Sequence, residues 1–276
     1  MRNPARNLTG SLLRILNIIN RHHRPTGDRV MRLWYWYLAR IDRKREIRFL
    51  NYGFSDDGPE LDLAPELANE RYPVQLYHHV AAVDLGGRDV LEVGCGRGGG
   101  AYYLAKRFRP RAYTGLDICR SAIGSCRSSY ALDNLSFIRG DAQRLPFPDA
   151  SFDVVINVES SHRYPDMRRF LGEVHRVLRE SGFFLFTDFR KADLVSGLHA
   201  QLRDAGFVTD REQRITPHVV RALQLDNPRR LELIHRLTPS FLATEAREFA
   251  GTEGTRLLAS FVDGEREYLS FVLRKA

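Results

Sequence analysis

One stretch of the chain, residues 89–100, constrains the fold more than any other. It begins with a mostly apolar run (90–93), which is typical of a short strand buried on both faces of a sheet. Five glycines follow over 94–100, and glycines let the backbone turn sharply and approach a ligand closely. Because helix-forming residues come next (101–108), the order strand, glycine loop, helix predicts a ligand site at the carboxyl edge of the first strand of an open α/β sheet.

The residues around the glycines indicate what kind of ligand this is. Gly94, Gly96 and Gly99 satisfy the G-x-G-x-x-G pattern of dinucleotide-binding proteins. Glu92, two residues before the first of them, would repel a pyrophosphate and suits a phosphate-free ligand with positive charge. S-adenosylmethionine (SAM), with its sulfonium and ammonium groups, fits that description. A glycine-rich turn that binds nothing, or an NAD-dependent dehydrogenase, is the alternative.

Composition limits the remaining classes. The 276 residues, 43% of them hydrophobic, suffice for one large domain with an appended segment. The net charge of +8 favours an anionic partner, although arginines spread over a solvated surface explain it equally well. Three cysteines without paired metal spacing predict neither a metal site nor a disulfide framework. Because neither a long apolar run nor a signal peptide is apparent, we expect a cytoplasmic protein without a transmembrane helix.

The N-terminal 50 residues form a separate basic segment. Helical apolar spacing over 8–19 and a dense aromatic cluster over 31–38 are both flanked by arginines. Such a segment can cover an apolar substrate, contact a second subunit or lie on a membrane surface. We expect this segment to act as a lid or as a homo-oligomer contact. Any contact with a membrane is expected to be peripheral. Beyond it, residues 66–83 have helical spacing, and Tyr52 is either a core aromatic or a residue that reaches over the cofactor.

Strand and helix patterns alternate over residues 89–188, which predicts a parallel sheet with right-handed crossovers. Asp117, Asp141 and Asn157 are expected just past three successive strands, beside the glycine loop. Asp117 is placed to bind a ribose diol or, alternatively, to cap the next helix. Asp141 can accept from the amine of an adenine ring. The later strands and helix are expected over 112–116, 135–138, 151–157, 167–182 (a helix stopped by glycine) and 183–186.

Several of these stretches together resemble the successive motifs of class I SAM-dependent methyltransferases: 90–100, 115–117, 140–142 and 151–155. Four further stretches resemble the phthiotriolone-type methyltransferases of actinobacteria: 51–54, 71–78, 157–165 and 247–255. Enzymes of that type methylate hydroxyls of polyketide-derived lipids, and related ones act on sugars, macrolides, indoles and prenylated natural products. The likeness covers most of residues 30–276.

The resemblance implies a set of cofactor-binding residues. Around the methionine part of SAM it implies Glu92, Gly94, Cys95 and Gly96, and at the ribose Asp117 and Ile118. At the adenine it implies Asp141, Ala142 and Gln143. Asn157 is expected to close the pocket from strand four, and Tyr52 and Gln75 to contact the cofactor from the N-terminal side.

The resemblance also implies the chemistry of the transfer. A sulfonium is an activated donor, so the protein mainly aligns the acceptor and removes a proton. His162, in the loop after strand four, is the expected base, and Asp188 would orient it or share the proton. Alternatively, His162 is an ordinary loop histidine and Asp188 a polar strand cap. No Asn/Asp-Pro-Pro motif follows strand four and no cysteine lies beyond Cys126, which argues against nucleic-acid methylation.

The C-terminal part completes the expected domain. Residues 206–215 predict strand six, and 266–274 predict an antiparallel strand seven at the sheet edge. The apolar helical stretch 216–252 predicts an inserted lid or a helical pair packed on the sheet. We therefore expect an α/β methyltransferase domain over 51–276, Rossmann-like, with a seven-stranded mostly parallel sheet and a helical cap. Its expected activity is O-methylation of a small hydrophobic natural product or lipid intermediate in secondary metabolism, with S-adenosylhomocysteine as the second product. One alternative is C-methylation of an indole or prenylated metabolite, with or without cyclisation. The other is SAM binding without catalysis.

Overall fold

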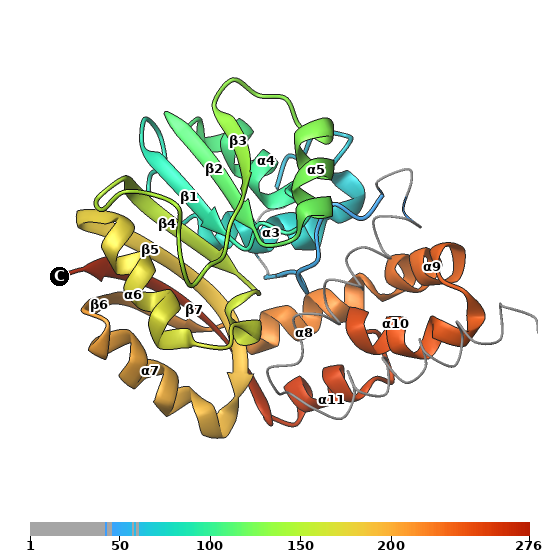
Figure 1. Ribbon diagram of the computed structural model, residues 1–276. Coiled ribbons are helices and arrows are strands. Elements are labelled where there is room, and N and C mark those ends of the chain that lie inside the picture. Colours follow the sequence, from blue (N-terminus) through green and yellow to red (C-terminus); the bar gives the residue numbers. More distant parts are fainter. Residues whose placement is uncertain (1–41, 43–45, 57, 59–60) are drawn as a thin grey trace, which may run out of the picture.

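The computed structural model of this chain describes residues 42, 46–56, 58 and 61–276. The amphipathic and aromatic stretches expected to act as a lid or subunit contact, 8–19 and 31–38, lie outside the described residues. The described part is an α/β fold in which helices cover both faces of one twisted sheet (Figure 1).

A seven-stranded sheet forms the centre of the fold, as predicted. Its order is β3-β2-β1-β4-β5-β7-β6. The first five strands in that order are parallel, and β7 runs antiparallel to both β5 and β6. The strands span Asp89–Val93 (β1), Ala112–Asp117 (β2), Leu135–Arg139 (β3), Phe152–Val158 (β4), Leu178–Lys191 (β5), Phe207–Arg214 (β6) and Arg266–Lys275 (β7).

Two details of the predicted sheet are wrong. Strand β7 does not lie at the edge, because its residues 268–273 are buried and it pairs with β5 on one side and β6 on the other. The edge strand is β6, whose residues 208–214 are exposed. The helix expected to continue to Gly182 ends at Val177, because Leu178 is extended and buried and pairs with Phe152 of β4. Strand β5 therefore begins five residues earlier than expected.

Two groups of helices pack on opposite faces of the sheet, each over its own apolar cluster. One cluster joins the sheet to α3, α4, α5 and the C-terminal helices, and the other joins it to α6 and α7. In place of the helix expected over 66–83, a short 3₁₀ turn (η1) precedes a ten-residue helix (α3). The helices and 3₁₀ turns up to β6 span Ala68–Glu70 (η1), Arg71–Val80 (α3), Gly99–Phe108 (α4), Arg120–Ser129 (α5), Ser161–Arg163 (η2), Met167–Val177 (α6), Ala192–Leu194 (η3) and Val195–Asp204 (α7).

The C-terminal helices form a separate group beside the sheet, orange to red in Figure 1. They span Thr216–Leu225 (α8), Asn227–Leu237 (α9), Ser240–Leu242 (η4), Ala243–Ala250 (α10) and Arg256–Val262 (α11). Buried Arg230 of α9 donates to the carbonyls of Asn51 and Tyr52 (3.2 and 3.1 Å) and of Ala250 (2.8 Å). This guanidinium ties the segment before α3 to the helical group over one edge of the sheet.

Candidate functional site

The glycine loop after β1 has the geometry that only glycines allow. Gly94, Gly96 and Gly98 have φ values of 80°, 53° and 79°. A Cβ on Gly94 would lie 2.3 Å from the Ser160 hydroxyl oxygen, and one on Gly100 would lie 2.0 Å from the Tyr77 ring. The loop thus approaches neighbouring groups at distances that no other residue type permits, and α4 begins directly behind it.

A narrow cavity of about 70 Å³ lies against this loop. It is small because the segment 48–52 covers the loop, and the Gly99 N–H donates to the Arg48 carbonyl at 3.2 Å. Six of the predicted site residues line it: Tyr52, Gly94, Cys95, Gly96, Asp117 and His162. Lining residues that the sequence reasoning missed include Phe49, Tyr77, Glu159, Ser160, Arg163 and Phe249.

Asp117 gives the cavity an acidic wall. Its two carboxylate oxygens accept from the backbone N–H of Gly96 (3.0 Å) and of Cys119 (2.8 Å). Burial raises the pKa of Asp117 above its usual value. Within the part of the chain that the structure describes, no cationic side chain forms an ion pair with this carboxyl. The site thus favours a ligand that brings hydroxyl donors or positive charge.

Glu92 lies behind the cavity rather than in its wall. Its carboxylate is fully buried and accepts from the hydroxyls of Tyr77 (2.8 Å) and Tyr113 (2.9 Å). Burial raises the pKa of Glu92 to about 7, although both hydrogen bonds act in the opposite direction. Its contact with a bound ligand stays a prediction, and the residue between it and the cavity is Tyr77.

Asn157 is a buried residue within β4, whereas the sequence analysis expected it just past the strand. The strand continues to Val158 because the β4–β5 pairing extends that far. The Asn157 amide donates to the Val93 carbonyl (2.8 Å) and to the Ser160 hydroxyl (2.7 Å), while its Oδ1 is buried without a hydrogen bond among the described residues. Asn157 therefore positions the loop end and Ser160.

The residues expected around adenine form a turn after β3, outside the cavity lining. The Asp141 carboxylate accepts from the Gln143 N–H (2.9 Å), and the Gln143 side chain accepts from the Asp166 N–H (2.8 Å). Ala142 is buried, and Ile118 is 41% exposed. Gln75, on α3, also lies outside the lining, and its Oε1 is buried without a partner among the described residues.

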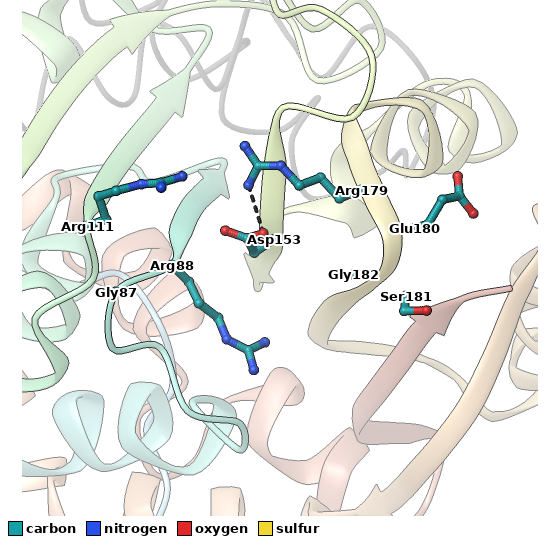
Figure 2. Close-up of a pocket in the computed structure, with 8 residues that line it drawn as sticks. All are labelled: Gly87, Arg88, Arg111, Asp153, Arg179, Glu180, Ser181 and Gly182. Carbon is teal, nitrogen blue, oxygen red and sulfur yellow. Dashed lines mark ion pairs between the residues drawn. The ribbon is translucent and has the colours of Figure 1, made fainter.

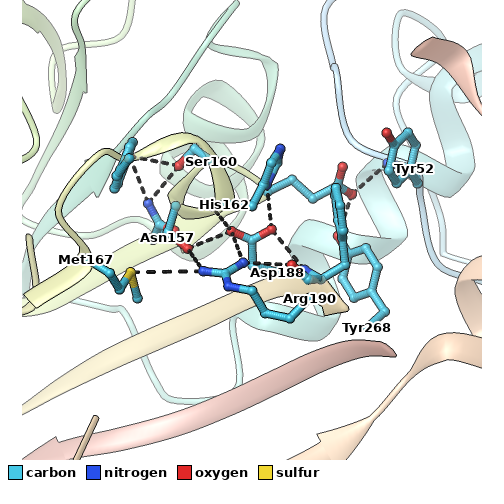
Figure 3. Close-up of polar contacts among 12 residues, drawn as sticks. Tyr52, Asn157, Ser160, His162, Met167, Asp188, Arg190 and Tyr268 are labelled. Atoms are coloured by element: carbon cyan, nitrogen blue, oxygen red, sulfur yellow. Dashed lines mark hydrogen bonds and ion pairs between the residues drawn. The ribbon is translucent and has the colours of Figure 1, made fainter. Parts of the chain in front are cut away.

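His162 and Asp188 are brought together, as predicted (Figure 3). His162 Nδ1 lies 2.7 Å from Asp188 Oδ1. The other carboxylate oxygen of Asp188 accepts from the His162 N–H (2.9 Å) and the Ser161 hydroxyl (2.6 Å) and pairs with Arg190 (3.2 Å). His162 Nε2 is buried and has no hydrogen bond within the described chain.

Charge and burial set the protonation of this pair. Burial lowers the pKa of His162 below its usual value, against the opposing effect of Asp188. Burial would raise the pKa of Asp188, but the charge that His162 gains at low pH and the charge of Arg190 hold it well below its usual range. The ring is therefore neutral at pH 7, with Nδ1–H donating to the carboxylate and the Nε2 lone pair free. This is the arrangement of a general base.

Aromatic rings form a packed cluster beside this histidine, and one of them, Tyr52, lines the cavity. Phe189 lies 4.4 Å from the His162 ring centroid, and Tyr52 lies 5.7 Å from Phe189. Phe261 of α11 and Tyr268 of β7 complete the cluster, 5.6 and 6.1 Å from Phe189. These rings come from three separate parts of the chain (around residues 52, 189 and 261–268), so no local sequence signal could have grouped them.

Glu159 is a second group that sequence reasoning missed, although it lies within the motif 157–165. Its φ of 46° is left-handed, which costs a non-glycine residue about 1–2 kcal/mol. Its Oε1 accepts from the Tyr52 N–H at 2.7 Å and, through a short contact, from the Tyr268 hydroxyl. Burial raises the pKa of Glu159 to about 8. A strained, half-buried acid thus lines the same cavity as His162.

A larger cavity, of about 540 Å³, lies at the opposite edge of the sheet (Figure 2). Arg179 pairs there with Asp153 (2.8 Å) and Asp89 (2.9 Å), and Arg111 Nε donates to Asp89 (2.8 Å). The Arg88 guanidinium stacks 5.4 Å over the Phe183 ring. Asp153 and two of the three arginines that line this cavity are paired, and Glu180 pairs with Lys275 (3.0 Å). Because these charges are mostly neutralised within the protein, we assign the functional site to the carboxyl edge.

No group of three or more histidines, cysteines or acids in the part of the chain that the structure describes is arranged to hold a metal ion. Among the same residues, no helix has the length and apolar character needed to cross a membrane.

Comparison with known proteins places these features in context. A family model described as "Methyltransferase domain" matches residues 91–186. The chain is 42% identical, over 91% of its length and 93% of the relative's, to a phthiotriol/phenolphthiotriol dimycocerosates methyltransferase of Mycobacterium tuberculosis. It is 43% identical to a fatty-acid O-methyltransferase of Mycolicibacterium smegmatis, over 78% of this chain and 80% of that one.

Solved structures with this fold have lower sequence identity. The [4+2]-cyclase SpnF is similar with a TM-score of 0.64 at 18% identity, over 88% of this chain and 94% of its own. Geranyl diphosphate C-methyltransferase of Streptomyces coelicolor, solved with S-adenosylhomocysteine, has a TM-score of 0.59 at 16% identity, over 86% of this chain and 93% of its own. These likenesses concern the fold.

Proposed function

Because the chain belongs to the class I SAM-dependent methyltransferases, in the family of the phthiotriol/phenolphthiotriol dimycocerosates methyltransferases, we propose that it methylates a hydroxyl of a hydrophobic natural product or lipid intermediate in secondary metabolism. The observation that supports this best is the buried Nε2 of His162, which lies at the cavity with a free lone pair while Asp188 holds the opposite nitrogen.

The residues present fit SAM, which supplies an activated methyl group when bound. The glycine loop offers close backbone approach, and Asp117, without a cationic partner among the described side chains, suits the ribose hydroxyls beside a positive charge. Asp141 and Gln143 would meet the adenine. Since the cavity has room for only a few water molecules, the covering segment 48–52 would move away when the cofactor binds.

The protein's own contribution to the transfer is deprotonation and alignment. His162 Nε2 would accept the proton of the acceptor hydroxyl, and Asp188 stabilises the imidazolium that forms. Asp188 is itself fixed by Ser161, Arg190 and two backbone N–H groups, so the ring is held in one orientation. The aromatic cluster (Tyr52, Phe189, Phe261, Tyr268) packs beside His162 and would limit the access of water to the ring.

The names of two relatives, a phthiotriol/phenolphthiotriol dimycocerosates methyltransferase and a fatty-acid O-methyltransferase, support a lipid-like acceptor. A cytoplasmic location and a homo-oligomer formed through the N-terminal 50 residues also belong to the proposal. Light scattering on the full chain would measure the mass of the assembly, and a monomer would contradict the proposed homo-oligomer.

The decisive test of the proposed function is methyl transfer itself. Purified protein is incubated with SAM labelled in the methyl group and a panel of long-chain alcohols, hydroxylated polyketides, fatty acids and prenylated indoles. We expect the label on an oxygen of a hydroxylated acceptor, located by NMR of the product. Label on carbon would establish C-methylation instead, and binding of SAM without transfer to any acceptor would contradict the proposal.

A further inference from the structure

Two cavity-lining side chains each have a polar atom outside their described hydrogen bonds: Nε2 of His162, which is buried, and Oε2 of Glu159, since both described hydrogen bonds of that carboxyl go to Oε1. The proposed function uses the first and leaves the second without a role. A polar atom that a bound ligand covers without a hydrogen bond is costly. The second atom therefore requires a polar partner on the ligand.

The geometry of Glu159 determines what its free oxygen can do. Oε1 is occupied by two donors, the Tyr52 N–H at 2.7 Å and the Tyr268 hydroxyl. When the carboxyl is protonated, its proton is therefore on Oε2, and Oε2–H is a hydrogen-bond donor. The left-handed backbone of Glu159, held by its N–H donating to the Thr187 carbonyl at 2.9 Å, fixes this orientation.

The surroundings keep that proton in place near neutral pH. Burial raises the pKa of Glu159 to about 8; the charge of Asp188 acts in the same direction, and that of Arg230 acts against it. The pKa values of Tyr52 and Tyr268 are raised, so both hydroxyls stay protonated. The titratable and charged groups near Glu159, on all the segments packed against it, are Tyr52, His162, Arg163, Asp188, Arg230, Arg266 and Tyr268.

We propose that Glu159 is a specificity-determining residue that donates a hydrogen bond from Oε2 to a second oxygen of the acceptor. The chain would then prefer acceptors that carry a carbonyl or hydroxyl oxygen beside the hydroxyl that is methylated, such as 1,3-diols and β-hydroxyketones. This inference rests on the proposed function, because it takes His162 as the group that receives the reacting hydroxyl. An acceptor without the second oxygen leaves Oε2 unpaired and is selected against.

The test compares matched acceptors. A long-chain secondary alcohol, the 1,3-diol and the β-hydroxyketone of the same chain length are each assayed for kcat/KM. We expect the two-oxygen acceptors to be preferred about ten- to hundredfold. Glu159→Gln keeps the contacts of Oε1 and places an amide donor where Oε2–H was, so it should retain most of the preference. Glu159→Ala should reduce the preference to nearly one.

Two controls separate this role from a structural one. Glu253→Gln, an exposed acid in the loop before α11, should leave the preference unchanged. Raising the pH above about 8 should reduce the preference of the unmodified protein, because Oε2 loses its proton, but not that of Glu159→Gln. Thermal unfolding and S-adenosylhomocysteine binding are measured for each variant.

The outcomes that overturn the inference are distinct. Equal turnover of the mono-alcohol and the two-oxygen acceptors contradicts this inference alone, as does a preference that survives in Glu159→Ala. A tenfold loss of S-adenosylhomocysteine binding in both Glu159 variants with an unchanged preference would assign Glu159 to the cofactor. Absence of transfer to every alcohol contradicts the proposed function together with this inference.

Discussion

The two edges of the sheet use charged residues in opposite ways. At the amino edge, Arg179 and Arg111 pair with Asp153 and Asp89, and the larger cavity there has charges that are mostly neutralised within the protein. At the carboxyl edge, polar side chains form hydrogen bonds through one atom and have no described partner at another. In His162, Nδ1 bonds to Asp188 while the buried Nε2 has no described partner. Cavity size alone would select the wrong edge, whereas unpaired polar atoms select the edge with chemistry.

The difference has a thermodynamic meaning. Exposed ion pairs contribute little to stability and commit their charges to each other. Buried groups with a free atom destabilise the protein unless a ligand satisfies them, and such sites persist where function requires them. The two edges should therefore respond differently to substitution: catalysis should fail at one edge, and only stability should change at the other.

The largest expected effect is on catalysis at the carboxyl edge. His162→Ala removes the proposed base and should lower kcat by about 10²- to 10⁴-fold. S-adenosylhomocysteine affinity, measured by calorimetry, should change less than about threefold, because His162 acts on the acceptor rather than on the cofactor. His199→Ala, which removes an exposed histidine bonded to Glu212, is the matched control and should have no effect. Unchanged turnover in His162→Ala would exclude the base role.

How far the sequence predicted this edge depends on the range of the interactions. The strand, glycine loop and helix of 89–108 follow from local propensity, and the pairing of His162 with Asp188 was expected from a family resemblance. Strand β7 was misplaced because edge and interior positions depend on which strand pairs beside it, a long-range property.

The parts that could not be predicted are those assembled from distant segments. The raised pKa of Glu159 comes from burial and the charge of Asp188, against the opposing charge of Arg230, and Tyr268 reaches Glu159 from more than a hundred positions along the chain. Glu92 was predicted as a ligand contact from its position before the glycines, yet both of its hydrogen bonds are to tyrosine hydroxyls on other elements. Tertiary packing decides these environments.

A smaller effect is expected from pH. The neutral form of His162 is the proposed base, and burial lowers its pKa below the usual 6.5. Activity should therefore persist to lower pH than an ordinary histidine base would allow, and it should fall tenfold per unit only below the folded-state pKa. The pH profile of kcat/KM with a non-ionisable alcohol measures this limb. In Asp188→Asn the limb should move to still lower pH, because the carboxylate charge that raises the pKa of His162 is lost. A midpoint above 6.5 would contradict the buried, neutral ring.

The smallest expected effect is at the amino edge. Arg179→Met removes the partner of both Asp89 and Asp153, but the guanidinium is partly exposed, so the free energy of unfolding should fall by at most about 1 kcal/mol. Urea denaturation measures this loss, which should shrink at high salt because screening already weakens the pairs. Methyl transfer should stay within twofold of the unmodified protein, since every proposed active-site group lies at the other edge. A fivefold or larger loss of kcat with an intact fold would mean that the two edges are coupled through the sheet, and the contrast between them would no longer hold.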